Sequence, residues 1–217
     1  MFRKTCRNLE DRNESRVIQD IARLIVPSAE TLATFGVNHL EILTENVNEG
    51  WNDSIALVGS CPQPDYSIGF KPSAFTEEQR EKLQPCIGSL TDISFFVATW
   101  RMYFSFLTCE VKCGAGALDV ADRQNAHSAT LAVRGVIELY RAMKREKELH
   151  REILTFSASH DNSSVRIYGH YALINQQKTT YYRHPIHKFD ITALDGKEKW
   201  TAYRFTKNVY DKFMPIH

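Results

Sequence analysis

The stretch Met-Tyr-Phe-Ser-Phe-Leu-Thr-Cys-Glu-Val-Lys, residues 102–112, decides the fold of this chain. It is mostly apolar and rich in aromatic residues, and glycines follow at Gly114 and Gly116, so it predicts a β-strand. Both faces are apolar until the last few residues, which indicates a central strand covered on each side. Residues two apart on a strand share a face, so Glu110 and Lys112 project together from its end. Buried charges are costly unless they are paired or bind a metal, which makes this strand end a candidate site.

A second strand-like run, Pro64-Asp65-Tyr66-Ser67-Ile68-Gly69-Phe70, lies upstream with an aspartate at its start. Pro64-Asp65 followed by Glu110-Val111-Lys112 resembles the signature of the PD-(D/E)XK nuclease superfamily. The fuller similarity is to the nuclease-like domains found in many fungal proteins. It includes the helix that opens with Asp122-Arg123-Gln124-Asn125 and spans about residues 64 to 140. Another acidic-x-lysine triplet, Asp195-Gly196-Lys197, follows no apolar strand and is expected to be a turn.

The resemblance implies an α/β fold with a restriction-endonuclease-like core, in which a central mixed β-sheet is flanked by helices. It also implies metal-dependent hydrolysis of phosphodiester bonds, with nucleic acid, DNA foremost, as the partner and Mg²⁺ as the cofactor, replaceable by Mn²⁺. Asp65 and Glu110 would share the metal, with the Val111 carbonyl as a further ligand, since hard cations prefer oxygen. Lys112 would position the attacking water or stabilise charge on the phosphate.

Glu14 and Gln124 are the supporting candidates. Residues around 10–26 form a predicted amphipathic helix, and Glu14 continues its apolar stripe. The first helix of the resembled family often supplies an extra carboxylate, which implies that Glu14 is a metal ligand. An exposed glutamate favoured by the helix dipole is the alternative. The resemblance assigns Gln124 to the catalytic site, although Ser128 replaces the tyrosine of the Gln-x-x-x-Tyr form.

Two other functions remain open from the sequence. The net charge of +1 is low for a nucleic-acid binder, so one alternative is an inactive nuclease-fold module that binds protein or nucleic acid. The other is a zinc-stabilised interaction domain that uses Cys109, Cys113 and C-terminal histidines. The run His184-Pro185-Ile186-His187 is interpreted as an ordinary loop, because no second cluster stands at ligand spacing.

The length of 217 residues predicts a single domain, with N-terminal helices in 1–50, a nuclease-like core from about 51 to 217 and an insertion at about 71–100. Five cysteines without a Cys-x-x-Cys pair favour a reducing compartment. No signal peptide and no run of membrane-spanning length is recognised, so we expect an intracellular protein, nuclear or cytoplasmic, without a membrane partner. The oligomeric state is not predicted.

The remaining elements are predicted from apolar periodicity and turn residues. The expected helices cover residues 28–35, 38–49, 119–149 and 199–213. The expected strands cover residues 55–58, which would pair with 66–70, and residues 153–157, 164–174 and 180–182.

Overall fold

A computed structural model describes residues 2–10, 12–87, 93–113, 118–175 and 178–214 of the chain. Within these ranges seven strands form one mixed sheet: six follow the order β1-β2-β4-β5-β6-β7, and β3 pairs with the start of β4. Neighbours are antiparallel except for the parallel pair β4 and β5. The strands are β1 (Leu43–Val47), β2 (Tyr66–Phe70), β3 (Val97–Thr99), β4 (Met102–Val111), β5 (Ile153–His160), β6 (Ser164–Asn175) and β7 (Lys178–Asp190).

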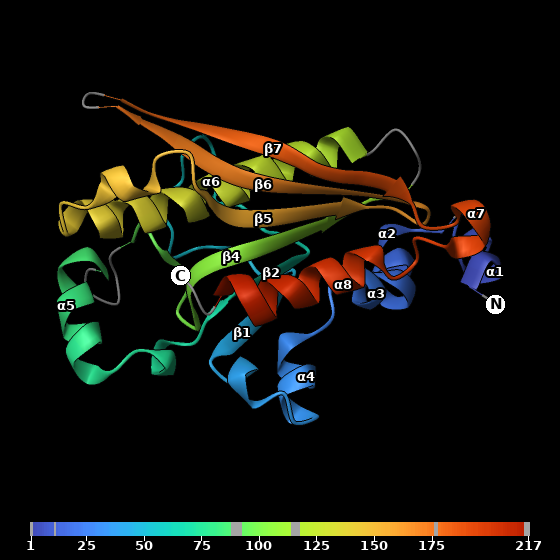
Figure 1. The fold of residues 1–217 in the computed structure, drawn as a ribbon, viewed down its shortest axis with the longest axis horizontal. Helices are drawn as coiled ribbons and strands as arrows, with labels where there is room; N and C mark the ends of the chain where they lie inside the picture. The colour runs from blue at the N-terminus through green and yellow to red at the C-terminus, as the bar shows by residue number, and fades with distance from the viewer. Residues whose placement is uncertain (1, 11, 88–92, 114–117, 176–177, 215–217) are drawn as a thin grey trace.

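Helices cover both faces of this sheet (Figure 1). The long helix α6 (Leu118–Ala142) lies on one face, against β4 and β5. The other face is covered by α2 (Glu14–Val17), the π-helix η1 (Ile18–Ala22), α3 (Arg23–Ile25) and α8 (Thr201–Asn208) with the π-helix η6 (Val209–Phe213). The remaining helices are α1 (Phe2–Arg7), α4 (Ala29–Thr34), α5 (Glu77–Ile87) and α7 (Ala193–Gly196). The predicted α/β architecture with a mixed sheet between helices is confirmed.

Strand β4 is the centre of the sheet, as its composition predicts. It pairs with β2 along one edge and with β5 along the other, β3 pairs with its first residues, and all but one of its residues are buried. Leu107, Cys109 and Val111 point into the core beneath the N-terminal and C-terminal helices. Thr108 bonds to Asn125 of α6, so the alternation places Glu110 on the α6 face as well.

Two predictions for the first third of the chain are wrong. Residues 38–49 do not form a helix: a 3-10 turn, η2 (Asn38–Leu40), is followed by β1, because Leu43 to Val47 pairs in register with β2. Residues 55–58 are not the partner of β2 and form no strand, and Val58 is exposed. The apolar spacing in 38–49 fits a helix as well as a strand, and the backbone hydrogen bonds to β2 decide between them. The segment 1–50 therefore contains a strand as well as helices.

The prediction for the His184-Pro185-Ile186-His187 run is also wrong. It lies within β7, which is far longer than the expected 180–182 strand. Pro185 stands opposite Tyr168 at a register shift, and β7 is an edge strand in which a missing N–H is tolerated. The run is therefore part of the sheet.

Two helical predictions and the expected insertion need adjustment. The predicted helix at 10–26 starts at Glu14, after the N-cap Asn13, and its middle is π-helical. The predicted helix at 119–149 ends at Ala142, and a separate 3-10 turn, η5 (Glu146–Leu149), follows. Within the expected insertion at 71–100, η3 (Pro72–Ala74) and α5 lie outside the sheet, but β3 joins it. The expected helices at 28–35 and 199–213 correspond to α4 and to α8 with η6.

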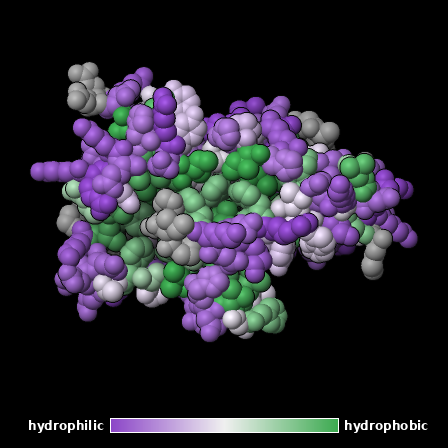
Figure 2. Space-filling model, viewed as in Figure 1, coloured by the Kyte–Doolittle hydropathy of each residue, from purple (hydrophilic) through white to green (hydrophobic). Residues whose placement is uncertain are grey.

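Apolar side chains gather near the middle of the face that carries α8, between α5 and α8 (Figure 2). A hollow of about 250 Å³ lies there. It is lined by Ile42, Phe70, Ala74, Phe75, Gln79, Phe104, Ser105, Phe106, Val136, Leu139, Tyr140, Leu154, Phe213 and Met214. It adjoins the start of β4, whereas Glu110 lies at the other end of that strand. Among the helices of the described ranges, none combines the length and the apolar character needed to cross a membrane.

Candidate functional site

Asp65 and Val111 join the start of β2 to the end of β4. Tyr66 pairs with Cys109, so the antiparallel register brings the residue before β2 beside the last residues of β4. The Val111 N–H donates a hydrogen bond to Asp65 Oδ2 at 2.7 Å. The Asp65 carboxylate is thereby fixed beside the Glu110 side chain, which is 3 % exposed.

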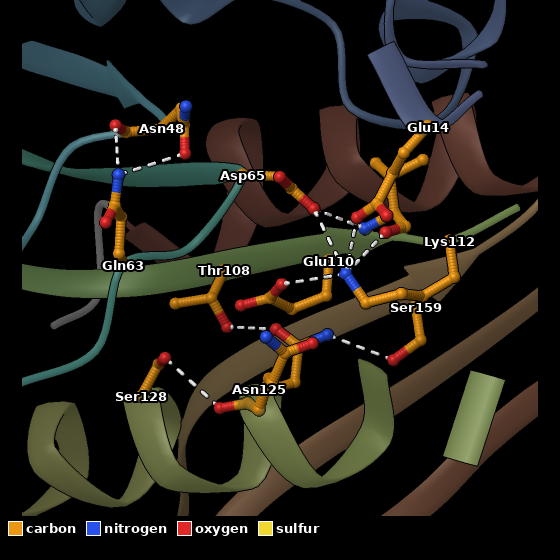
Figure 3. A network of polar contacts seen from close by, with 12 residues as sticks. Glu14, Asn48, Gln63, Asp65, Thr108, Glu110, Lys112, Asn125, Ser128 and Ser159 are labelled. Carbon is orange, nitrogen blue, oxygen red and sulfur yellow. Dashed lines mark hydrogen bonds and ion pairs between the residues drawn. The ribbon is translucent and has the colours of Figure 1, made fainter. Parts of the chain in front are cut away.

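Lys112 is the centre of the charged cluster (Figure 3). Its backbone N–H bonds to the His160 carbonyl at 3.0 Å, which extends the pairing with β5 by one residue. Its Nζ donates to Glu14 Oε1 at 2.5 Å and to the Val111 carbonyl at 2.8 Å. The same Nζ lies 4.0 Å from Asp65 Oδ2 and 3.9 Å from Glu110 Oε2. One ammonium group is therefore surrounded by three carboxylates and a carbonyl oxygen.

The pKa values of this cluster reflect burial and mutual repulsion. Burial, the Asp65 charge and a hydrogen bond with the Asp65 carboxyl raise the pKa of Glu110 to about 8, against the opposing effect of Lys112. Burial also raises the pKa of Asp65, although the Val111 N–H and Lys112 act against it. Burial lowers the pKa of Lys112, but the bond to Glu14 and the neighbouring carboxylates outweigh burial, so that its pKa is raised. Lys112 is charged at neutral pH, and the two carboxyl groups compete for negative charge.

The oxygen donors at this point suit Mg²⁺. Asp65 and Glu110 converge, and the Val111 carbonyl oxygen faces the same space because it accepts from Lys112 Nζ. Mg²⁺ usually keeps several waters and is held through one or two carboxylates, so two carboxylates and a carbonyl are an adequate donor set. The third carboxylate, Glu14, is engaged by Lys112. Within the described ranges no group of three or more His, Cys, Asp or Glu side chains is arranged to hold a metal ion, so any ion here depends on the carbonyl and on water.

The cluster lies in an open cleft of about 500 Å³. The cleft is lined by Glu14, Asn48, Ser60, Cys61, Pro62, Gln63, Asp65, Glu110, Lys112, Gln124, His127 and Ser128. The structure thus brings together the five side chains that the sequence singles out: Glu14, Asp65, Glu110, Lys112 and Gln124. Of the supporting pair, Glu14 contacts Lys112 directly, whereas Gln124 is an exposed residue of the α6 wall.

Asn125, the neighbour of Gln124, positions α6 over the sheet. Its side chain is buried, accepts from Thr108 Oγ1 at 2.7 Å, and donates to the Ala158 carbonyl at 2.9 Å and to Ser159 Oγ at 3.0 Å. These bonds tie the first turns of α6 to β4 and β5. The side chain of Gln124 therefore projects toward the cleft instead of the core.

Sequence reasoning missed the rest of the cleft wall. Asn48, Gln63 and His127 give no recognisable motif, and Asn48 falls in a stretch that predicts a helix. Gln63 stands two residues before Asp65 and holds Asn48 through bonds from Nε2 to the Asn48 carbonyl and side-chain oxygens at 3.0 and 3.1 Å. No signal in a single sequence identifies this long-range pairing.

The residues proposed for zinc are separated. Cys109 is fully buried in the hydrophobic core, and Cys113 is exposed. His184 and His187 lie on the exposed surface of β7. The second acidic-x-lysine triplet, Asp195-Gly196-Lys197, is not part of the cleft, since Asp195 lies in α7 and pairs with Arg3.

The chain belongs to the family described as Domain of unknown function (DUF7924), whose model matches residues 1–217. No curated protein matches the sequence.

Proposed function

We propose that this member of the DUF7924 family hydrolyses phosphodiester bonds in nucleic acid with the help of a divalent metal ion. One observation carries the proposal: the half-buried carboxylate of Asp65, the buried carboxylate of Glu110 and the ammonium group of Lys112 converge in one cleft at the end of the central strand. Burying like charges together destabilises a fold, so a fold that contains such a pair has a structural or a chemical reason for it. The neighbouring Lys112 and the hard oxygen donors favour the chemical reason.

Asp65, Glu110 and the Val111 carbonyl would hold the Mg²⁺ ion. When bound, such an ion supplies Lewis-acid polarisation of the phosphate and lowers the pKa of water. The protein's part is to keep both carboxylates fixed before binding, which the Val111 N–H does for Asp65 and burial does for Glu110. Their raised pKa values mean that metal binding would displace protons from the pair.

Lys112 would act on the phosphate. Its side chain is 14 % exposed, so its charge is weakly screened by water and acts strongly on nearby groups. It would position the attacking water or stabilise the negative charge that grows on the phosphate oxygens. Glu14 accepts a hydrogen bond from the ammonium group and would keep it in place. Gln124 would orient substrate from the α6 wall.

The arrangement of elements supports the PD-(D/E)XK assignment. An aspartate just before β2, the Glu-x-Lys triplet at the end of β4 and the covering helix α6 follow the order that the resemblance implies. We therefore propose a restriction-endonuclease-like core, with Mg²⁺ or Mn²⁺ as cofactor and DNA as the first substrate to test.

A cleavage assay on the purified chain tests the proposal. Labelled single-stranded and double-stranded DNA and RNA are incubated with Mg²⁺, with Mn²⁺ or with EDTA. We expect cleavage that depends on the metal and is lost in Glu110→Ala, whereas Glu41→Ala, at an exposed position outside the cleft, behaves like the parent. Cleavage that persists in EDTA or in Glu110→Ala would show that the activity resides elsewhere.

An inactive scaffold is the second candidate, and one observation favours it. Lys112 Nζ already lies within 4.0 Å of both carboxylates proposed as metal ligands, so the cluster is held together without an ion. A module of this kind would bind nucleic acid or protein without cleaving. Calorimetric titration with Mn²⁺ separates the two, because a protein that neither binds Mn²⁺ nor cleaves any of the substrates fits the scaffold alone.

A further inference from the structure

The cleft beside Lys112 has two walls that meet above the charged cluster. One wall is formed by the segment between β1 and β2, through Asn48 and residues 60–63. The other wall is the first part of α6, through Gln124, His127 and Ser128. Its volume of about 500 Å³ falls in the range of about 300–1,000 Å³ that pockets for small ligands occupy. The cleft is thus large enough for one small ligand.

The walls carry hydrogen-bonding groups that are not cationic. They present the amides of Asn48, Gln63 and Gln124, the hydroxyl of Ser60 and the imidazole of His127, whereas the Cys61 thiol and the Ser128 hydroxyl bond to backbone carbonyls. Burial and the nearby Arg134 lower the pKa of His127, so it is neutral at pH 7. Such groups match the donors and acceptors at the edges of nucleobases, where glutamine and asparagine are common partners.

Positive charge is scarce in the same place. Among the described residues that line the cleft, Lys112 is the one lysine or arginine, and carboxylates surround it. The sequence positions outside the described ranges contain neither lysine nor arginine, so they add none. Proteins that hold duplex DNA neutralise several phosphates with such residues, about 6–10 in strong binders. The cleft walls do not offer the phosphate contacts that a continuous duplex needs.

Aromatic stacking does not replace these contacts. Proteins that bind single strands without sequence preference stack bases on aromatic side chains. Apart from the imidazole of His127, no aromatic ring lines the described part of the cleft. Recognition here must therefore depend on hydrogen bonds, which distinguish one base from another.

The β1–β2 wall is held rigid next to Asp65. Gln63 is bonded to Asn48, the Asn48 N–H donates to the Asp65 carbonyl at 3.0 Å, and the indole of Trp51 donates to Ser67 Oγ. Asn48 has a φ of 50°, in the left-handed region, which asparagine tolerates better than most residues. The amide groups of this wall are thus fixed relative to the charged cluster before any ligand binds.

We infer that the cleft takes one unpaired nucleotide beside the scissile phosphate and reads its base through the amides of both walls. The substrate class is then single-stranded nucleic acid, or the unpaired tail of a duplex, with a preference for particular bases. This inference rests on the proposed function for its cleavage step, while the recognition step can be measured by itself.

The test uses one labelled oligonucleotide in three forms: alone, as a blunt duplex, and as a duplex with an unpaired tail, each as DNA and as RNA, with Mn²⁺. We expect cutting in unpaired segments at least about tenfold faster than within the duplex, because extruding a paired nucleotide costs free energy. Tails that differ in one base should differ in rate. Gln63→Leu should reduce this spread, whereas Gln19→Leu, exposed and outside the cleft, should leave it unchanged.

Fluorescence anisotropy on the same oligonucleotides separates the two proposals. Cutting inside the blunt duplex as fast as in the single strand would overturn the inference and leave the proposed function standing. Tighter binding of the tailed duplex than of the blunt one, with no cutting of either, would support the inference and overturn the proposed function. The absence of both cutting and preferential binding would overturn both. A difference in binding or cutting between the DNA and the RNA oligonucleotides shows which sugar the cleft accepts.

Discussion

Asp65 accepts a hydrogen bond from the backbone N–H of Val111, the middle residue of the Glu-x-Lys triplet, at 2.7 Å. The Val111 side chain is buried in the core on the opposite face, so its contributions on the site side are its amide and its carbonyl. Two strands far apart in sequence are thus locked together by the carboxylate that is proposed to bind the metal. The Asp65 carboxylate thus has a structural role and a proposed chemical role, and different substitutions of Asp65 can separate the two.

Asp65→Asn should preserve the fold and weaken metal binding. The asparagine carbonyl can still accept from the Val111 N–H, but it removes a charged ligand and also relieves the repulsion that raises the pKa of Glu110. Asp65→Ala loses both functions and leaves a buried amide without its partner, at about 1–3 kcal/mol. Urea unfolding and Mn²⁺ calorimetry on both variants check this. Equal stability losses for Asn and Ala would contradict the role given to the hydrogen bond.

The stability of the metal-free protein should fall as the pH rises from about 4.5 toward about 8. Glu110 has a native pKa near 8 and an ordinary value of 4.5, so in this range the folded chain keeps a proton that the unfolded chain loses. Stability from this group is complete below 4.5 and lost above 8, with a slope of roughly 1 kcal/mol per pH unit. The raised pKa of Asp65 acts in the same direction. Urea midpoints in EDTA at several pH values measure the slope.

Glu110→Gln should flatten this pH dependence, because glutamine does not titrate and needs no proton to be buried. Glu41→Gln, which changes an exposed glutamate outside the cleft, should retain the slope of the parent. A parent-like slope in Glu110→Gln would mean that other groups control it.

The apolar pattern of residues 102–111 predicts β4 and hence the centre of the sheet, since few arrangements bury both faces of a strand. The pairing of Asp65 with the end of β4 follows from the order of the motifs. Periodicity is weaker at the margins of the sheet. Residues 43–47 carry a pattern compatible with both helix and strand, and only the hydrogen bonds to β2 decide for β1.

Other features depend on contacts that no local pattern contains. The edge strand β7 accepts Pro185 at a register shift, so the proline does not mark a loop. The turn at Ile18–Ala22 is π-helical, although the spacing of its apolar residues predicts an ordinary α-helix. The bond between Gln63 and Asn48, which builds a wall of the cleft, joins two amides in segments without a motif. Local sequence predicts the charged cluster, and tertiary contacts determine the cleft around it.

Two neighbouring residues of α6 should respond to substitution in opposite ways. Asn125→Ala leaves buried groups on β4 and β5 without partners, so it should lower the free energy of unfolding by at least about 1–3 kcal/mol. Gln124→Ala alters an exposed side chain and should change stability by less than about 0.5 kcal/mol. Its effect should appear in cleavage instead. Chemical denaturation beside a cleavage time course measures both, and a large stability loss in Gln124→Ala would contradict its placement.

The last prediction separates metal binding from chemistry at Lys112 and Glu14. Lys112→Ala should bind Mn²⁺ as well as the parent or more tightly, because it removes a positive charge 3.9 Å from Glu110. It should nevertheless lose cleavage by about 10²–10³, the usual effect of removing a group that stabilises the transition state. Glu14→Ala should keep Mn²⁺ affinity if its carboxylate serves Lys112, as the 2.5 Å contact indicates, and should slow cleavage less than Lys112→Ala does.

The measurements are Mn²⁺ calorimetry and single-turnover cleavage on the parent and on the variants Lys112→Ala, Glu14→Ala and Glu14→Gln. Glutamine can still accept a hydrogen bond from Lys112 Nζ, so Glu14→Gln should recover part of the activity that alanine loses. A clear loss of Mn²⁺ affinity in Glu14→Ala would instead identify Glu14 as a metal ligand, the role that the family resemblance implies. Cleavage by Lys112→Ala at the parental rate would remove Lys112 from the mechanism. Because Lys112 contacts all three carboxylates, the pattern across these variants assigns each carboxylate to the ion or to the lysine.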